Sequence, residues 1–241
     1  MNGCAEDPTN GGKEPEKTEI SSTDSVRVDT SQKVEQEPPI SEREAMFLQK
    51  GLIDVQEMIP EVLVDLKYSS DDNFMGFDLY GDLDRCYLQP DVAQMLKKAH
   101  ESLVKQDSTL TFLIYDGVRP RSIQQMMWDS LDMPFERKIR FVSNPQFGSL
   151  HNFGAAVDIT LARDSEALDM GAGYDDTSLV AWPIHEQQML EAGLLDQQQL
   201  TNRYVLRRAM SAGGFFNIQS EWWHFNACYR EEAQRRYEII E

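Results

Sequence analysis

The sequence predicts one α+β catalytic domain with a mainly antiparallel central sheet flanked by helices. Short β-prone runs and longer stretches with helical periodicity both occur, which indicates a mixed structure. The regular strand-helix-strand alternation of a parallel sheet is missing, so an antiparallel arrangement is favoured. No internal repeat divides the chain into similar units.

The composition separates the chain into two parts. Of the 241 residues, 41% are apolar and 10% aromatic, which is ordinary for a globular protein. Residues 1–45, however, contain no Phe, Tyr or Trp and carry 11 acidic against 5 basic side chains. Such a segment cannot bury enough apolar surface to offset the entropy lost on ordering it. We therefore expect a disordered acidic linker over 1–45 and the catalytic domain over 46–241.

Several stretches have the apolar spacing of amphipathic helices. The first begins at Pro90 with Asp91 placed to cap it, and the second has Pro120 in its first turn and Met126 on its apolar face. The pair Gly213-Gly214 is expected to end the third. These stretches are 90–103, 120–127, 202–211 and a surface helix over 229–240.

Strands are expected where apolar and β-branched residues gather. The run 110–115 is apolar on both faces and stops at Asp116-Gly117, which is typical of a buried strand that ends in a turn. The stretch 155–161 alternates, so Asp158 should point away from the face that its aliphatic neighbours bury. The aromatic stretch 215–225 is expected to return as one strand.

Charge and cysteine content exclude several classes of protein. The net charge of −18 argues against a nucleic-acid partner, because phosphate-binding proteins need a basic face. No run of about 18 apolar residues is present, so we expect neither a membrane span nor an intact signal peptide. The three cysteines, at positions 4, 86 and 228, lie too far apart in sequence to suggest a thiolate metal site. No apolar stripe indicates an oligomeric interface.

Cys4 differs from the other cysteines in its surroundings. It follows Gly3 at the head of the acidic segment, as in a bacterial lipoprotein after its signal peptide is removed. A lipid anchor on Cys4 would tether the enzyme in the cell envelope or periplasm. The alternative is a free thiol in an unstructured tail, which leaves a cytoplasmic location open.

The stretch Ser149-Leu-His-Asn-Phe-Gly-Ala-Ala-Val-Asp158 is a candidate metal motif. A catalytic zinc ion takes three protein ligands, keeps one position open for water and works with a free carboxylate. His151 and Asp158 could meet at one metal if His151 lies in the loop leading into the strand that carries Asp158. A chance occurrence of His and Asp at this spacing is the alternative.

The stretch Glu221-Trp-Trp-His224 could supply the third ligand, His224, and the base, Glu221. In a flat strand two residues three positions apart point to opposite faces, so convergence on one metal needs a bulge or bend. A histidine with a purely structural role is the competing interpretation of His224. The remaining histidines, His100 and His185, lack such a context and are not expected to bind metal.

Arg119 follows the Asp116-Gly117 turn, at an edge from which side chains are presented to a cleft. Its guanidinium could stabilise negative charge that develops on a carbonyl oxygen, since arginine stays protonated. A salt bridge to Asp116 is the competing interpretation.

Together these motifs resemble a known family. The stretches Asp116-Gly-Val-Arg-Pro120, Ser149 to Asp158 and Glu221 to His224 are similar to those of the zinc D-alanyl-D-alanine dipeptidases associated with vancomycin resistance, within the Hedgehog-like D,D-peptidases. Further matches occur in the expected order, so the resemblance covers about residues 55–225. These further matches are Asp65-Leu-Lys-Tyr68, Asp72-Asn-Phe74, Met170 to Asp175, Asn202-Arg203 and Leu206-Arg207.

The resemblance implies a role for each matching residue. His151, Asp158 and His224 would hold one zinc ion per chain, with Glu221 as general base and acid and Arg119 as the stabiliser of the tetrahedral oxyanion. Three more residues, Tyr68, Ser149 and Asp175, would lie at the substrate pocket, where Asp175 is the natural partner of a dipeptide's ammonium group. The implied activity is hydrolysis of D-Ala-D-Ala or a closely related dipeptide in peptidoglycan metabolism.

Two other functions stay open. A D,D- or L,D-carboxypeptidase could use the same zinc site on longer stem peptides, unless an acid such as Asp175 closes the pocket. A non-catalytic module could bind wall fragments, although it would gain nothing from retaining both Glu221 and Arg119. The acidic leader is not part of the family's core, and a tether there would favour turnover of wall-derived dipeptides outside the cytoplasm.

Overall fold

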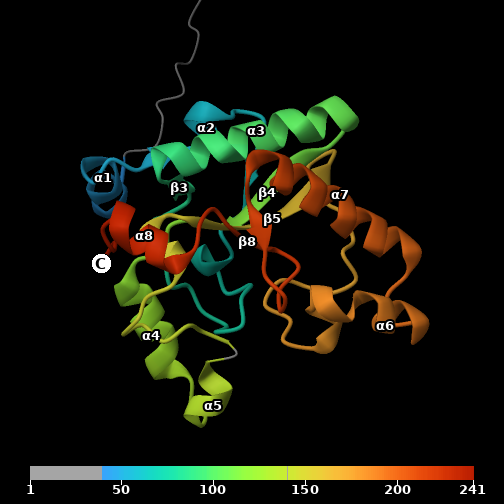
Figure 1. The fold of residues 1–241 in the computed structure, drawn as a ribbon. Coiled ribbons are helices and arrows are strands. Elements are labelled where there is room, and N and C mark those ends of the chain that lie inside the picture. The colour runs from blue at the N-terminus through green and yellow to red at the C-terminus, as the bar shows by residue number, and fades with distance from the viewer. Residues whose placement is uncertain (1–39, 140) are drawn as a thin grey trace, which may run out of the picture. The chain divides into compact units, whose positions relative to one another are not determined.

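A computed structural model describes residues 40–139 and 141–241. Within them lies a six-stranded sheet, made of β2 (Leu63–Val64), β4 (Thr111–Asp116), β5 (Ala156–Arg163), β6 (Glu166–Ala167), β7 (Phe216–Asn217) and β8 (His224–Asn226). The strand order is β2-β4-β5-β8-β7, and β6 pairs with the far end of β5. Strands β4, β5 and β8 are labelled at the middle of the sheet in Figure 1. In this sheet β2 and β4 are parallel and the other pairs are antiparallel. The predicted α+β class with a mainly antiparallel sheet is confirmed.

Helices surround this sheet, and a separate antiparallel pair is formed by β1 (Ile53–Asp54) and β3 (Tyr87–Leu88). The α-helices are α1 (Glu42–Gln49), α2 (Val55–Met58), α3 (Pro90–Gln106), α4 (Arg121–Ser130), α5 (Phe135–Lys138), α6 (Glu186–Glu191), α7 (Gln197–Gly213) and α8 (Arg230–Arg236). The 3-10 helices are η1 (Lys67–Ser69), η2 (Leu150–Phe153), η3 (Leu179–Ala181) and η4 (Pro183–His185).

Helices α3 and α7 pack together beside the sheet (Figure 1). The ring of Phe112 on β4 lies 5.8 Å from that of His100 on α3, and Phe112 pairs in register with Leu161 on β5. Because side chains alternate along a strand, Leu161 and Val157 share the face toward α3. Asp158 therefore faces the other way, as its position in the alternating stretch predicts.

A β-bulge at the end of β4 changes which residues share a face. The register pairs Ile114 with Ile159 and then Asp116 with Asp158, so Tyr115 is the extra residue. A bulge redirects the side chains that follow it. Without it, Asp116 would share the face of Ile114, whereas with it Asp116 lies opposite Asp158 on the site face.

Helix α7 is longer than the predicted stretch 202–211. It begins at Gln197 because Asp196 and Gln199 form a capping box: the Asp196 carboxylate accepts from the Gln199 backbone amide (2.8 Å), and the Gln199 side chain accepts from the Asp196 amide (2.8 Å). The predicted end at Gly213-Gly214 is confirmed. Gly214 has φ +99°, in the left-handed region that favours glycine at a helix C-terminus.

Helix α3 begins at Pro90 as predicted, but Asp91 does not cap it, and α4 begins one residue later than predicted. Gln89 is the N-cap of α3, and Asp91 lies inside the first turn, where it accepts a hydrogen bond from the Tyr237 hydroxyl (2.7 Å). The backbone at Pro120 is extended, so α4 begins after this residue and not with it. Met126 was expected on the packed face of α4 but is 47% exposed.

The expected single strand over 215–225 is instead a hairpin. Strands β7 and β8 are joined by residues 218–223, which include Glu221. The Asn217 side chain holds this turn by donating to the carbonyls of Glu221 (2.9 Å) and His224 (2.7 Å). Helix α8 is likewise shorter than the predicted stretch 229–240, because its C-cap Tyr237 is already extended.

The folded domain starts earlier than the expected boundary at residue 46. Helix α1 begins at Glu42 and is capped by Ser41, whose hydroxyl accepts from the Glu44 amide (3.2 Å). The linker was expected over residues 1–45, and its residues 1–39 lie outside the described residues. In the described part of the chain, no helix has the length and apolar character needed to cross a membrane.

Candidate active site

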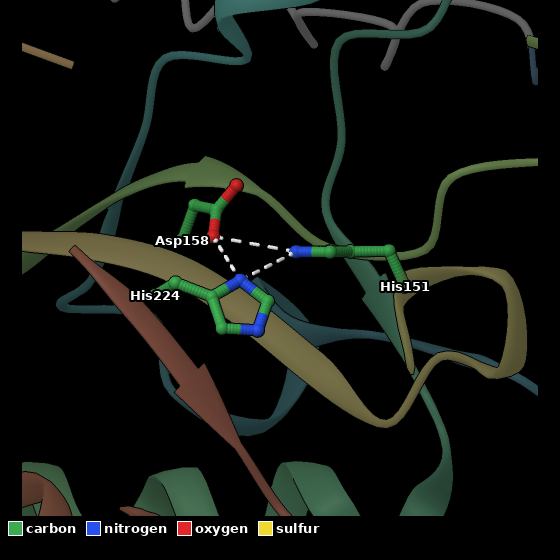
Figure 2. A group of neighbouring side chains, drawn as sticks. All are labelled: His151, Asp158 and His224. Carbon is green, nitrogen blue, oxygen red and sulfur yellow. Dashed lines mark hydrogen bonds and ion pairs between the residues drawn. The ribbon is translucent and has the colours of Figure 1, made fainter. Parts of the chain in front are cut away.

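Three predicted side chains converge on the open face of the sheet (Figure 2). Asp158 Oδ1 lies 2.9 Å from His224 Nδ1 and 3.3 Å from His151 Nε2, and the two nitrogens are 3.1 Å apart. All three side chains are largely shielded from solvent, with 3%, 4% and 13% of the His151, Asp158 and His224 side chains exposed. They form a group that could hold one metal ion.

Strand register explains how residues so distant in sequence meet. Asp158 on β5 and His224 on β8 are direct cross-strand partners, which places their side chains next to each other on one face. His151 comes from η2, which ends at Gly154 before β5 begins. Gly154 has φ +63°, and a Cβ there would lie 3.0 Å from Leu52, so this tight entry into β5 favours glycine.

Hydrogen bonds on the far side of each imidazole determine which nitrogen faces the centre. His151 Nδ1 lies 2.7 Å from the Gly117 carbonyl, which can only accept, so Nδ1 carries the proton and Nε2 keeps its lone pair. His224 Nε2 lies 2.8 Å from Asn226 Oδ1, so Nδ1 is the nitrogen that faces Asp158 Oδ1. His151 Nε2 and His224 Nδ1 are therefore the two nitrogens placed to bind a metal, and His224 Nδ1 gives up its proton when the metal binds.

The remaining oxygen of Asp158 is also occupied. Tyr174 donates its hydroxyl to Asp158 Oδ2 (2.9 Å), and the Arg119 guanidinium lies 3.6 Å from the same atom. Burial opposes ionisation of Asp158, but the neighbouring His151 and His224 hold its pKa well below the ordinary value. The site thus contains a buried carboxylate that stays ionised and attracts a cation.

The donor set fits zinc. Two neutral imidazole nitrogens and one carboxylate oxygen make a common catalytic set, in which outer hydrogen bonds orient the ligands. In a tetrahedral zinc site with bonds of about 2.0–2.1 Å, neighbouring ligand atoms are roughly 3.3 Å apart. The separations of 2.9 to 3.3 Å among the three atoms are close to this value.

Glu221 stands beside the three donors, in the turn between β7 and β8. Its Oε2 lies 3.9 Å from His224 Nδ1. Burial raises the pKa of Glu221 above the ordinary value, and the charge of Asp158 adds to the rise while His224 opposes it. A carboxylate with a raised pKa beside the donor group suits the transfer of a proton in both directions.

Arg119 combines the two interpretations open from the sequence. Its Nε donates to Asp116 Oδ2 (2.9 Å), so the salt bridge exists. Asp116 is itself held by the Tyr80 hydroxyl (2.6 Å), and the Arg119 guanidinium lies 4.8 Å from the centre of the Tyr68 ring. The ion pair therefore fixes the guanidinium at the wall of the site, and fixed donors are what oxyanion stabilisation needs.

A cavity of about 330 Å³ encloses these groups. Asp175 accepts from the Tyr68 hydroxyl (3.2 Å), and burial, with the charge of Asp158, raises the pKa of Asp175 to about 7. Ser149 lies at the wall, where its hydroxyl donates to Gln124 Oε1 (2.7 Å). Eight of the predicted site residues line the cavity: Tyr68, Arg119, Ser149, His151, Asp158, Asp175, Glu221 and His224.

The other two histidines, which were not expected to bind metal, lie away from the cavity. His100 pairs with Thr111 Oγ1 (3.1 Å) beneath α3, and His185 ends η4. Neither residue lines the cavity. Cys4, the candidate lipidation site, lies outside the described residues.

Two residues of the site were not predicted from the sequence. Asn226 orients His224, and its place two positions further along the same strand is a usable signal, because such residues share a face. Tyr174 binds Asp158, but it comes from a stretch without regular structure, and no local pattern places it there. The contribution of the Gly117 carbonyl is likewise a result of the fold alone.

A mixed sheet that gathers two histidines and an aspartate around one point, next to a carboxylate and a guanidinium, is the arrangement of a mononuclear metallohydrolase. The comparison with known families agrees with this class. The family model described as D-ala-D-ala dipeptidase matches residues 48–240, and the chain belongs to this family.

Curated relatives share most of their length with the chain. A D-alanyl-D-alanine dipeptidase of Escherichia coli (strain K12) is 35% identical over 176 residues, covering 72% of this chain and 83% of the relative. A D-alanyl-D-alanine dipeptidase of Enterococcus faecalis is 26% identical over 194 residues, covering 74% of this chain and 92% of the relative.

Solved structures give more distant likenesses. The vancomycin-resistance D,D-dipeptidase VanXYg, in complex with a D-Ala-D-Ala phosphinate analog, has a TM-score of 0.37 and 19% identity, covering 65% of this chain and 58% of that one. The LD-carboxypeptidase LdcB has a TM-score of 0.31 and 16% identity, covering 62% and 63%. At these scores the likenesses carry no functional argument.

Proposed function

We propose that this protein is a zinc-dependent D-alanyl-D-alanine dipeptidase that acts in cell-wall metabolism. One observation carries the proposal: in a chain of the D-ala-D-ala dipeptidase family, the donors His151, Asp158 and His224 converge in the same cavity that Glu221 and Asp175 line. The donors account for the metal, Glu221 for proton transfer and Asp175 for recognition of a free amino terminus.

The reaction needs a nucleophile, an oxyanion stabiliser and a proton carrier. Zinc held by His151, Asp158 and His224 would polarise the peptide carbonyl and lower the pKa of water toward about 7. Glu221 takes the proton of the attacking water, and its raised pKa makes it a stronger base than an ordinary carboxylate. The same carboxyl then delivers that proton to the leaving amine.

Arg119 supports this reaction without a change of protonation. Its ion pair with Asp116 holds the guanidinium in place before substrate arrives. Charge that grows on the carbonyl oxygen therefore meets a donor that needs no reorganisation. This preorganisation also argues against a non-catalytic binding module, which would gain nothing from an oxyanion stabiliser.

Asp175 favours a dipeptide over a longer peptide. A free ammonium group would form an ion pair with the shielded carboxylate, whereas the uncharged amide of an extended peptide would not gain this interaction. Asp175 also lines the adjoining cavity of about 380 Å³, so it stands where an amino-terminal extension would have to pass. This position supports the dipeptidase over the carboxypeptidase alternative.

The test uses the zinc-loaded protein with four substrates: D-Ala-D-Ala, L-Ala-D-Ala, N-acetyl-D-Ala-D-Ala and a wall pentapeptide. We expect release of free alanine from D-Ala-D-Ala, and much slower cleavage of the acetylated dipeptide, which differs only in its blocked amine. If D-Ala-D-Ala is not cleaved, the proposal is wrong. Faster cleavage of the pentapeptide would instead establish the carboxypeptidase.

Two variants assign the roles. Glu221→Gln should keep bound zinc and lower kcat by about 10²–10⁴-fold, because it removes the proton carrier alone. His151→Ala should lose zinc as measured by metal analysis. Glu101→Gln, at an exposed position on α3, is the matched control and should behave as wild type.

The location is a separate proposal. We propose that a lipid on Cys4 tethers the enzyme in the cell envelope, where it would degrade wall-derived dipeptides. Its support is the Gly3-Cys4 pair at the head of an acidic segment. Mass spectrometry of the protein from its native source should show a diacylglyceryl mass on the peptide that contains Cys4, and an unmodified Cys4 would contradict the proposal.

A further inference from the structure

The loop that carries Asp175 lacks regular structure over most of its length. We call residues 169–180 the Asp175 loop. It supplies Tyr174, which donates to Asp158 (2.9 Å), and Asp175, which accepts from Tyr68 (3.2 Å). Asp175 has φ +60°, a left-handed conformation that is unfavourable for a side-chain-bearing residue. Contacts from outside the loop must therefore impose this geometry.

Arg203 of α7 reaches both ends of the Asp175 loop. Its Nε donates to the Met170 carbonyl (2.7 Å) and its Nη1 to the Val180 carbonyl (3.0 Å). The residue is only 1% exposed, so these bonds form away from water. One planar guanidinium thus ties together two loop positions on either side of Asp175.

A charged side chain is costly to bury, and its partners explain how it is tolerated. Nη1 of Arg203 also lies 3.3 Å from Glu186 Oε1, and Arg207 binds the same carboxylate through two contacts of 2.7 Å. The carboxylate charge and the two carbonyls offset only part of the desolvation of the guanidinium: Nη2 has no hydrogen-bond partner among the described residues, and burial lowers the pKa of Arg203. An apolar side chain of similar volume could fill the space but could not bind either carbonyl.

Neighbouring contacts attach the same loop to α7 and to the β7–β8 turn. Asn202 donates to the Asp169 carbonyl (2.8 Å), next to the Met170 carbonyl that Arg203 binds. Trp222 donates to the Ala172 carbonyl (3.0 Å), and it adjoins Glu221 in the chain. The Asp175 loop therefore gets its shape from side chains that themselves lie outside the cavity.

We propose that Arg203 is a positioning residue for substrate recognition: by binding both ends of the Asp175 loop it places the Asp175 carboxylate where it meets the substrate's ammonium group. This inference rests on the proposed function, because it concerns how that same site binds its dipeptide. Arg203 itself does not line the cavity, so it acts through the loop.

The experiment compares Arg203→Met with Arg208→Met, which makes the same change at an exposed position of the same helix. With zinc bound, Arg203→Met should raise KM for D-Ala-D-Ala by about tenfold or more and change kcat little, since ground-state binding is lost. Arg203→Lys keeps the charge but cannot bind both carbonyls in the same way, so its KM should lie between those of wild type and Arg203→Met. Arg208→Met should match wild type.

A second background separates positioning from general destabilisation. In Asp175→Asn protein the ammonium partner is already lost, so adding Arg203→Met should raise KM no further. An equal rise in both backgrounds, or a fall in kcat at unchanged KM, would overturn the inference. If Arg203→Met does not fold, the same comparison is made with Arg203→Lys.

Amide hydrogen exchange provides a readout that does not depend on turnover. Exchange over residues 169–180 should be faster in Arg203→Met than in Arg208→Met and wild type. If exchange is unchanged in Arg203→Met while the wild type cleaves D-Ala-D-Ala, the inference is refuted and the proposed function stands. If the wild type does not cleave D-Ala-D-Ala but exchange in the loop is faster in Arg203→Met, the proposed function is refuted, whereas the attachment of the loop by Arg203 is not.

Discussion

Asp158 is the residue on which most of the site depends. It pairs across strands with His224, accepts from Tyr174 and faces Arg119. Burial raises the cost of its charge, yet the two imidazoles keep its pKa low. Burial lowers the pKa of His224. Without a metal, however, Asp158 and Glu221 outweigh burial and raise this pKa to about 9. A metal ion that binds here takes the place of that proton.

On the side of the ring away from Asp158, His224 Nε2 pairs with Asn226 Oδ1. We expect Asn226→Leu, which keeps the branched shape but removes the acceptor, to weaken zinc binding by about 10–100-fold. Competition with a chelator measures this loss, with Asn144→Leu in a loop as the control. Unchanged zinc affinity in Asn226→Leu would show that the hydrogen bond does not orient the ring.

The pKa of Asp175 predicts a dependence on pH. Because this pKa is raised to about 7, protonated Asp175 contributes folding stability that is complete below its unfolded pKa of about 4 and is lost as pH rises through about 7. Asp175→Asn should therefore raise the Tm of the metal-free protein more at pH 8 than at pH 5.

The same titration affects substrate binding. The ionised carboxylate binds the ammonium group, so KM of the wild type should fall between pH 6 and pH 8. KM of Asp175→Asn should be higher and nearly constant over this range. A wild-type KM that is flat across the range would contradict the assignment of Asp175 to the ammonium group.

At the scale of elements, the contact between α3 and α7 shows how sequence and packing combine. Amphipathic periodicity predicts both helices, but only their packing reveals why a glycine occupies position 213. A Cβ at Gly213 would lie 2.4 Å from the Met95 carbonyl and 2.8 Å from Ala99 Cβ on α3. The glycine therefore permits a close approach of two helix backbones.

Gly213→Ala should force these helices apart. The overpacking is expected to lower the free energy of unfolding by about 1–3 kcal/mol, measured by urea denaturation. Gly193→Ala is an instructive comparison, since no atom lies within 4 Å of its added Cβ and only its φ of +71° opposes the change. Gly213 has no positive φ, so a loss there reports the helix contact, and an unchanged free energy of unfolding in Gly213→Ala would show that the two helices accommodate the added Cβ.

For the whole molecule, the site brings together segments that are far apart in the sequence. Donors come from η2, β5 and β8, and Glu221 comes from the turn before β8. A metal that binds only the folded chain stabilises it by mass action. Removal of zinc with a chelator should lower Tm, and adding zinc back should restore it.

His151→Ala provides the control for this measurement, because its Tm should respond little to either treatment. A wild-type Tm that does not change on chelation would indicate that the site holds no tightly bound metal. Differential scanning calorimetry at a fixed protein concentration measures these Tm values.

Local patterns in the sequence predict the strands at 110–115 and 155–161, the face of Asp158 and the end of α7 at glycine. They fail at the cap of α3, at the first residue of α4 and at the hairpin β7–β8, where the Asn217 side chain holds the turn. At the cap of α3 a distant side chain is involved, because Asp91 accepts a hydrogen bond from Tyr237. Propensity within a short window cannot contain such contacts.

The sequence by itself determined the chemistry of this protein: which donors, acid and cation are present, their order along the chain and their resemblance to a family of dipeptidases. Only the tertiary structure decided how they meet. The β5–β8 register sets Asp158 beside His224, the bulge in β4 turns Asp116 toward Arg119, and Arg203 ties down the loop of Asp175. Residue identities are local information, whereas register and loop placement depend on packing between segments far apart in the chain.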